Sequence, residues 1–493
     1  MPPRSMYNPC AAGKKSQVTC LDFLPAAYEL YMIQGSTFPC AHPLHEILLC
    51  VQEIVADLAA VLSVCTALCV SAYMPHVQSC DIFPICFSID TGALYVCGQN
   101  RDGQLGLSHT DDVSHFSLCS SLQSERVSTV SCGWDFTIIL TDSGRVLSCG
   151  SNAFGQLGIP HVKSSSVPEP VQSLQEKVLD ISAGLRHSLA LTDSGGVFQW
   201  GVGLASHAKR FSCGNPVPPF LTAKEPSRIP GLENVKGRKV IAGSYHSVTV
   251  TEDGDLYVWG SNKHGQLLQK ETFVLWPQRI EPHFFSGERI RSAWSGWTHL
   301  VAQTDSGKVY TWGRADYGQL GRDGEKEQPQ DSGAEHFPKP LLCIPRLTGA
   351  DQITCGSQHN LAVCGTAVYS WGWNEHGMCG DGTETNVEIP TQISIPAPHP
   401  ATVKLIACGA GHSMILCVNP DGKDFDFPSE RLQVTLCGDN TVCGAETCIL
   451  RLSLPFLLDH EGFSRGDMQP VETHQSIMMP SPSLLIKASS THW

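Results

Sequence analysis

Short apolar runs separated by small polar turns dominate the chain from about residue 86 onward. The stretch GWDFTIILTDSGRVLSCGSN, which begins at Gly133, contains an apolar strand, a D-S-G turn and a second apolar strand that ends in glycine. Glycine supplies the positive φ that tight hairpin turns demand. A polar loop, a short proline-bearing strand and another apolar run follow before the pattern starts again. The sequence therefore predicts four antiparallel strands per unit, which corresponds to one blade of a β-propeller.

The units recur at nearly constant spacing. Strands that end in Cys-Gly or Trp-Gly are separated by 52, 51, 59, 53 and 59 residues, and they end at Gly98, Gly150, Gly201, Gly260, Gly313 and Gly372. A polar turn with G-Q-L follows four of these strands, as in NAFGQLG from Asn152. Periods of this length are typical of solenoids, arrays and propellers. The repeat predicts an all-β fold.

A second landmark, G-x-x-H, repeats in phase with the first and has a phenylalanine variant. Its glycines are Gly133, Gly184, Gly243, Gly296, Gly356 and Gly409, and its histidines are His187, His246, His299, His359 and His412. The histidines occupy equivalent places in separate blades. We therefore expect each one to hydrogen-bond backbone within its own blade, and we expect no shared metal site. Trp200, Trp259, Trp312 and Trp371 also recur once per unit, which predicts a packing role between blades.

The pattern divides the chain into three parts. Residues 1–85 are cysteine-rich and lie outside the repeat, and one helix is predicted around residues 45–72. The repeats occupy residues 86–418, and the tail 419–493 has no period, so we expect it to be mostly disordered. The apolar stretch 58–73 is shorter than the ~20 residues of a membrane-spanning helix. A buried helix is therefore favoured there, with a membrane anchor as the alternative, and no stable membrane insertion is expected.

Charge and composition exclude several function classes. The formal net charge is −14, which argues against a nucleic acid as the main partner. The 22 cysteines are mostly scattered singly, in places where other repeats carry small residues, which favours a reducing compartment. The chain contains no phosphate-binding loop, dinucleotide fingerprint, nucleophile elbow or H-E-x-x-H motif. We expect no cofactor, no metal ion and no covalent catalysis.

The turn glycines, G-Q-L-G and G-x-x-H together resemble the regulator of chromosome condensation repeat, a family of seven-bladed β-propellers. The resemblance covers about residues 90–418. Family members carry one more pair of motifs where residues 1–85 stand here, so we expect six complete blades and an incomplete or improvised first blade. Either the N-terminal segment improvises part of a blade, or the chain is a variant product with a defective ring; the variant product is favoured.

The resemblance implies guanine nucleotide exchange on a small Ran-like GTPase and, for the most similar members, a link to secretion, an exocyst partner and a cytoplasmic and nuclear location. In the family, the variable positions of G-x-x-H face the GTPase. The corresponding positions here are Asp135, Arg186, Tyr245, Thr298 and Gln358, together with Trp297. Thr298 stands where the family has a histidine. A monomer is expected, with an acidic face that would attract a basic GTPase. The alternative is a non-catalytic propeller scaffold that binds a GTPase or the exocyst.

Overall fold

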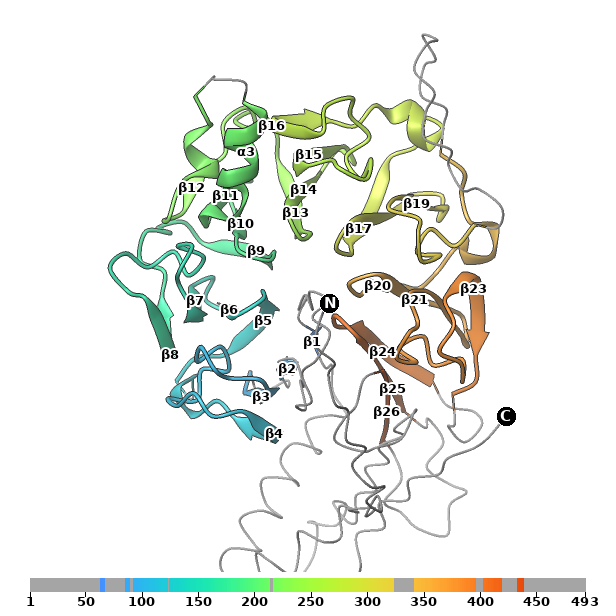
Figure 1. Ribbon diagram of the computed structural model, residues 1–493, viewed down its shortest axis with the longest axis horizontal. Coiled ribbons are helices and arrows are strands. Elements are labelled where there is room, and N and C mark those ends of the chain that lie inside the picture. The colour runs from blue at the N-terminus through green and yellow to red at the C-terminus, as the bar shows by residue number, and fades with distance from the viewer. Residues whose placement is uncertain are drawn as a thin grey trace, which may run out of the picture. The chain divides into compact units, whose positions relative to one another are not determined.

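The computed structural model describes residues 63–66, 85–88, 92–122, 124–212, 216–322, 341–395, 402–418 and 432–438. These residues belong to one compact unit, Leu49–Trp493. They form seven antiparallel sheets, of which five have four strands and two have three (Figure 1). We call these sheets blades 1 to 7 in chain order. The prediction of an all-β propeller is confirmed.

The strands of each blade follow one another in sequence, and each pairs with the next. Blade 1 contains β1 (Ser63–Thr66), β2 (Ile85–Ser88), β3 (Leu94–Gly98) and β4 (Val113–Leu118). Blade 2 contains β5 (Val127–Cys132), β6 (Phe136–Thr141), β7 (Val146–Ser151) and β8 (Ser164–Pro170). Blade 3 contains β9 (Val178–Ala183), β10 (Ser188–Thr192), β11 (Val197–Trp200) and β12 (Ser227–Arg228). Blade 4 contains β13 (Gly237–Ala242), β14 (His246–Thr251), β15 (Leu256–Ser261) and β16 (Phe273–Arg279).

The last three blades differ in strand number. Blade 5 contains β17 (Ile290–Ser295), β18 (His299–Thr304) and β19 (Val309–Gly313), and a single bridge between Tyr310 and Cys343 marks the place of a fourth strand. Blade 6 contains β20 (Gln352–Cys355), β21 (His359–Cys364), β22 (Ala367–Gly372) and β23 (Val387–Ile393). Blade 7 contains β24 (Thr402–Cys408), β25 (His412–Val418) and β26 (Leu432–Gly438).

Short helical segments lie in the connections. They are η2 (Ser120–Leu122), η3 (Val202–Leu204), α3 (Ala205–Phe211), η4 (Pro219–Leu221), η5 (Pro282–Phe285) and η6 (Pro345–Leu347). The segments η3, α3 and η4 fill the long connection of blade 3, which lacks G-Q-L. Leu204, Ala208 and Phe220 from this connection are buried against blades 3 and 4. The insertion therefore packs onto the propeller and adds a helix to one of its faces.

The first strands of the blades form a closed cycle. Each of β5, β9, β13, β17, β20 and β24 contacts the first strand of the next blade, and β1 contacts both β5 and β24. Figure 1 shows the blades following one another in this order. Of the two possibilities for the N-terminal segment, the structure shows the improvised blade, because β1 pairs with β2 and β2 pairs with β3.

Both ends of the repeat differ from the sequence-based expectation. The helix predicted around residues 45–72 is wrong at residues 63–66, which form β1. Val64 and Thr66 are β-branched, and pairing with β2 satisfies backbone groups that a helix would satisfy internally. The rest of that helix and most of the apolar stretch 58–73 lie outside the described residues. At the other end β26, from the predicted tail, pairs with β25 and completes the sheet of blade 7; the remaining tail lies outside the described residues.

The core is divided among the interfaces between neighbouring blades. Trp200, Trp259 and Trp371 have no exposed surface and Trp312 is 2% exposed, so their predicted packing role is confirmed. Each tryptophan also donates its indole Nε1 hydrogen to the preceding blade. The acceptors are the carbonyls of Gln156, Gln266 and Gln319 for Trp200, Trp312 and Trp371, at 2.9 to 3.0 Å. These glutamines are the central residues of G-Q-L, so the motif serves the interface between blades.

An asparagine that stands three residues before G-Q-L stabilises the turn by hydrogen bonds to its backbone. The Asn152 side-chain oxygen accepts a hydrogen bond from the Leu157 amide at 3.0 Å, and Asn262 holds Leu267 in the same way at 2.7 Å. The glutamine side chain closes the same turn, because the Phe154 amide donates to Gln156 Oε1 at 2.8 Å. The loops are thus fixed by local side-chain to backbone bonds, which is how Asn and Gln favour turns over regular structure.

Candidate functional site

The G-x-x-H turns join the first and second strands of their blades, and steric fit explains their glycines. At Gly184 a Cβ atom would lie 2.2 Å from Cε1 of His187 and 2.7 Å from the carbonyl oxygen of Gly243 in the next blade. At Gly133 a Cβ atom would lie 1.9 Å from the Phe136 ring. Any side chain at this position would therefore displace the ring of its own turn. Glycine here serves close packing.

The repeat histidines bond to the next blade, which corrects the expectation that each bonds within its own blade. Nε2 of His187 lies 3.1 Å from Ser247 Oγ, and Nε2 of His359 lies 3.0 Å from Ser413 Oγ. His246 reaches Ser295 at 3.0 Å and His299 reaches Asn360 at 2.8 Å. The expectation failed because the acceptor is supplied by a residue 49 to 61 positions along the chain, which no local pattern indicates.

Burial determines the ionisation of these histidines. Desolvation lowers the pKa of His187, His246 and His359 to about 3, and that of His299 and His412 to about 4. Neutral imidazole is the form that burial favours. The histidines therefore act as neutral structural bridges. Across the parts of the chain that the structure describes, no cluster of three or more His, Cys, Asp or Glu side chains could hold a metal ion.

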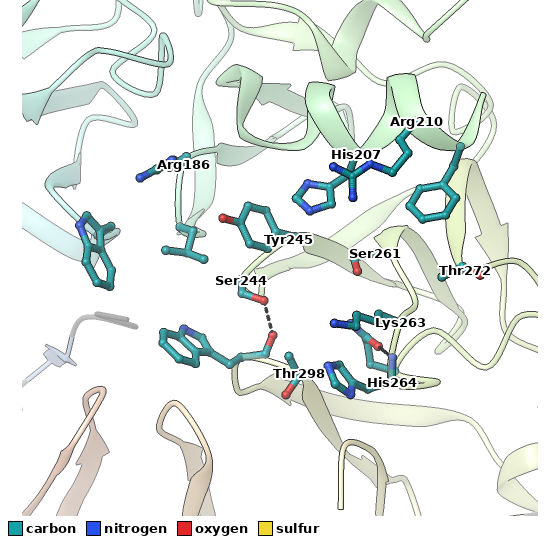
Figure 2. Close-up of a pocket in the computed structure, with 15 residues that line it drawn as sticks. Arg186, His207, Arg210, Ser244, Tyr245, Ser261, Lys263, His264, Thr272 and Thr298 are labelled. Atoms are coloured by element: carbon teal, nitrogen blue, oxygen red, sulfur yellow. Dashed lines mark hydrogen bonds between the residues drawn. The ribbon is translucent and has the colours of Figure 1, made fainter. Parts of the chain in front are cut away.

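The first variable position of each turn links the turns to one another. The Trp134 amide donates to the carbonyl of Leu185, and the Leu185 amide donates to that of Ser244. The Ser244 amide donates to the Trp297 carbonyl at 3.2 Å, and its hydroxyl donates to the same oxygen at 2.6 Å (Figure 2). The Trp297 amide continues the chain to Ser357 at 2.8 Å. Each turn is thus held in a fixed position relative to the next.

The second variable position carries the residues that the sequence predicted to face a partner, and two of them are engaged internally. Asp135 Oδ1 accepts a hydrogen bond from Gln156 Nε2 at 3.0 Å, and desolvation raises the pKa of its carboxyl group. Gln358 is 4% exposed and accepts a hydrogen bond from Gln319 Nε2 at 2.6 Å. Its own amide donates to Thr298 Oγ1 at 3.0 Å. Neither Asp135 nor Gln358 lines the pocket described next.

The other four predicted residues come together at one pocket of about 590 Å³ on this face. Arg186, Tyr245, Trp297 and Thr298 line it, as do the neighbouring turn residues Trp134, Leu185 and Ser244. Figure 2 shows the side chain of Tyr245 between Arg186 and the helix α3. The Arg186 guanidinium carbon stacks over the Phe154 ring, 4.3 Å from its centre. The pocket therefore joins the G-x-x-H turns of blades 2 to 5.

The sequence reasoning missed the rest of the lining. His207, Arg210 and Phe211 come from α3, and Lys263 and His264 come from the polar turn after β15. A signal was present for the helix, because the run ASHAKRF is basic and stands where G-Q-L is missing. Nothing in the sequence, however, indicates that this insertion folds over the turn of blade 4. The Tyr245 ring lies 4.8 Å from that of His207.

The pocket is basic, whereas the sequence led us to expect an acidic partner face. None of its lining residues is Asp or Glu, whereas Arg186, Arg210 and Lys263 are cationic. Desolvation, Arg210 and Lys263 lower the pKa of His207. Desolvation, Arg314 and Lys263 lower the pKa of His264, with Asp316 opposing. The chain has a formal charge of −14, yet this surface is basic. The net charge of a chain does not say how its acidic and basic residues are distributed over the surface.

No helix within the described residues is long and apolar enough to cross a membrane. The pocket also lacks the glycine-rich phosphate loop of nucleotide-binding folds, since its walls are β-turns and α3. Its chemistry is that of a recognition surface with cations, aromatic rings and hydroxyls. Nothing in it resembles a nucleophile with its base.

Comparison with known proteins gives consistent results. The RCC1-like domain matches residues 84–415. The mouse protein named secretion-regulating guanine nucleotide exchange factor is 54% identical over 358 residues, which cover 70% of this chain and 76% of the mouse protein. The cattle protein of the same name is 56% identical over 340 residues, which cover 67% and 73%.

A solved structure agrees at the level of fold. Prp20p from Saccharomyces cerevisiae superposes with a TM-score of 0.55 at 23% identity, covering 67% of this chain and 79% of that one. The shared fold and the identity to the two mammalian proteins are consistent with each other. Together with the domain match over most of the repeats, they establish that this chain belongs to the family of RCC1-like domain proteins.

Proposed function

We propose that this protein is a guanine nucleotide exchange factor for a small Ran-like GTPase and that it acts in the regulation of secretion. The observation that carries the proposal is the identity of 54% and 56% to two proteins named as secretion-regulating exchange factors, over about two thirds of the chain. The pocket-lining face formed by the G-x-x-H turns supports it, because linked turns provide a rigid surface for a protein partner.

Exchange of this kind needs no nucleotide site on the propeller. A partner that binds the nucleotide-free GTPase more tightly than the loaded form lowers nucleotide affinity by the same factor by which nucleotide lowers the affinity for the partner. Tyr245, Trp297 and Thr298 would supply contacts of the kind that dominate protein interfaces, since aromatic side chains carry much of the binding energy there. The residues of this chain would thus bind the GTPase and distort its nucleotide site. The only reaction is dissociation of the nucleotide.

The test is release of a fluorescent guanine nucleotide from Ran-like GTPases by catalytic amounts of the protein. We expect acceleration, and we expect Trp297→Ala to reduce it about tenfold or more, as loss of an interface anchor does. The control is Trp276→Ala on β16, whose side chain is 45% exposed and does not line the pocket. Thermal melting of both variants separates lost recognition from lost folding.

A non-catalytic scaffold is the second candidate, and one observation favours it. Asp135, the acidic residue of the predicted GTPase face, is bonded to Gln156 and is not part of the pocket. Unchanged nucleotide release combined with retained binding of the GTPase in a pull-down would establish the scaffold and exclude the exchange factor.

The remaining parts of the proposal concern the cell. We propose that the protein is a monomer, that it is present in cytoplasm and nucleus, and that an exocyst subunit is a further partner; the reference to secretion in the names of both mammalian relatives supports the last point. Light scattering after gel filtration, imaging of tagged protein and co-precipitation with exocyst subunits test the three points separately.

A further inference from the structure

The cations of the pocket form no salt bridges within the described parts of the chain. Several basic residues elsewhere on the propeller pair with a carboxylate, as Arg279 does with Asp255 at 2.7 Å and Lys308 with Glu288 at 2.6 Å. By contrast, Arg186, Arg210 and Lys263 form no ion pair with any carboxylate in the described parts of the chain. Nε of Arg186 is in addition buried without a hydrogen-bond partner.

The three cations stand on three different walls. Arg186 belongs to the turn of blade 3, Arg210 to α3, and Lys263 to the turn after β15. Figure 2 shows them around Tyr245 on separate sides, with no two of them on the same turn. Cations spread in this way match several carboxylates along an extended segment. A single phosphate is held better by donors that converge on one point.

Apolar surface lies between the cations. Phe211 is 39% exposed, although it is a large aromatic side chain at the end of α3, and its ring stacks on that of Phe273 with centres 6.1 Å apart. Tyr245 and Trp297 also line the pocket, and the indole Nε1 of Trp297 is buried without a hydrogen-bond partner. A ligand for this pocket therefore needs both negative charge and an apolar group.

We propose that this pocket binds an acidic peptide segment of a partner protein, with its carboxylates against Arg186, Arg210 and Lys263 and an apolar side chain against Tyr245, Phe211 and Trp297. Charge complementarity is the basis for the choice of occupant, since the lining contains three unpaired cations and no acid. The pocket volume of about 590 Å³ is sufficient for several side chains. The inference does not depend on nucleotide exchange, because the segment can belong to any partner.

The probe is a fluorescein-labelled hexapeptide, Glu-Asp-Leu-Phe-Asp-Glu, titrated with the full chain and followed by fluorescence anisotropy. Two controls are the amide peptide Gln-Asn-Leu-Phe-Asn-Gln and the peptide with Ser-Ser in place of Leu-Phe. We expect both to bind at least about tenfold more weakly than the acidic peptide, because charged hydrogen bonds and apolar burial each contribute to binding. The affinity of the acidic peptide should also fall as salt is raised.

The decisive variants differ only in position. Arg210→Gln with Lys263→Gln removes one charge from α3 and one from the turn after β15, both in the pocket. The matched pair, Lys209→Gln with Lys270→Gln, removes one exposed charge from the same helix and one from the same connection, outside the lining. We expect a loss of about tenfold or more for the pocket pair and less than about twofold for the matched pair.

Three results would overturn the proposal. The first is equal binding of the acidic and amide peptides, or no binding of the acidic peptide to the folded chain. The second is an equal loss in both variant pairs, which would mean attraction to net charge alone. The third is displacement of the peptide by inorganic phosphate at matched ionic strength, which would make the pocket a site for small anions. Because no GTPase is present in these titrations, failure here leaves the exchange test unaffected, and the reverse also holds.

Discussion

The repeat histidines meet the next blade in two different ways. From blade 3 to blade 7, each repeat histidine crosses to a hydroxyl or amide side chain of the next blade, as His359 does to Ser413. At the interface where blade 7 meets blade 1, Nε2 of His412 is buried and has no hydrogen-bond partner among the described residues. The two interfaces share the glycine beneath the ring, but they differ in what the ring can reach.

Two of the hydroxyl partners share one register position. Ser247 and Ser413 occupy the register position opposite the last residue before the strand-ending glycine, since Ser247 pairs with Trp259 and Ser413 with Cys437. In blade 1 the residue at this position is Ile85, which pairs with Cys97. The improvised blade closes the cycle of first strands, and its interface with blade 7 lacks the polar bridge that the four interfaces from blade 3 to blade 7 carry.

Acidification should cause the largest loss of folding stability, because it acts on every interface that carries a repeat histidine. The folded-state pKa of the five histidines, about 3 to 4, lies below their unfolded value of about 6.5. The unfolded state therefore binds more protons below pH 6.5, and stability falls as the pH drops from about 6.5 toward 4. We expect a loss of about 1.4 kcal/mol per histidine at about pH 5.5, or about 7 kcal/mol in total.

Asp180 acts in the opposite direction, because burial raises its pKa to about 6 and protonation there favours the folded state, by about 1 kcal/mol at the same pH. Urea unfolding at a series of pH values measures the net slope. In His412→Phe the acid loss should be smaller by one histidine. A flat profile between about pH 7.5 and about 5.5 would contradict the buried neutral state of the histidines.

A methyl group beneath the histidine ring should destabilise both interfaces, and the bonded one more. In Gly356→Ala the new Cβ would lie 2.1 Å from Cε1 of His359 and 2.6 Å from the carbonyl oxygen of Gly409, and the ring is held by Ser413. We expect a loss of about 3 kcal/mol or more. In Gly409→Ala the nearest atoms belong to the His412 ring, which has no bond to break at Nε2, so the loss should be smaller. Equal losses in urea unfolding would show that the bond does not hold the ring.

Blade 3 lacks G-Q-L, and the side chain of Gln199 supplies the acceptor for the repeat tryptophan at its interface with blade 4. Its Oε1 accepts hydrogen bonds from Trp259 Nε1 at 2.7 Å and from Ser247 Oγ at 3.3 Å. Gln199→Met should cost about 2 kcal/mol, because it leaves a buried indole donor unsatisfied. The same change in a Trp259→Phe background should cost less, and a double-mutant cycle from denaturant melts gives the coupling. Additive losses would mean that the Trp259 bond contributes nothing.

The smallest effect isolates the polar bridge itself. His359→Phe keeps an aromatic ring over the glycine, as Phe136 does naturally, and removes the bond to Ser413, which still donates to the Met378 carbonyl at 2.7 Å. We expect a loss of about 1 kcal/mol. His412→Phe removes a nitrogen that has no partner and should change stability by less than about 0.5 kcal/mol. Reversal of this order in matched melting experiments would show that the two interfaces are equivalent.

Local chemistry explains what could be predicted from the sequence. Positive φ at turn glycines, apolar strand runs and the once-per-unit tryptophans depend on neighbours within a few residues, and they predicted the propeller and its inter-blade core. The histidine bridges could not be predicted in this way. Their partners lie 49 to 61 residues away, and a serine at Ser247 looks like any other strand residue until the blades are stacked.

The candidate site, too, could be predicted from the sequence only in part. The repeat motif placed Arg186, Tyr245, Trp297 and Thr298 on one face, and the structure brings these four together at the pocket. The motif could not indicate that Asp135 and Gln358 are hydrogen-bonded to other residues of the propeller. Nor could it indicate that α3 and the turn after β15 add Arg210 and Lys263 and make the surface basic. Charge and pocket shape depend on where insertions fold.

The sequence by itself determined the repeating unit, because hairpin turns and strand patterns are local properties of the chain. Tertiary structure decided how the units join: which side chain each histidine reaches, how β1 and β2 improvise the first blade, and which cations surround Tyr245. These outcomes depend on contacts between residues far apart in the chain, and such contacts exist only once the blades pack against one another.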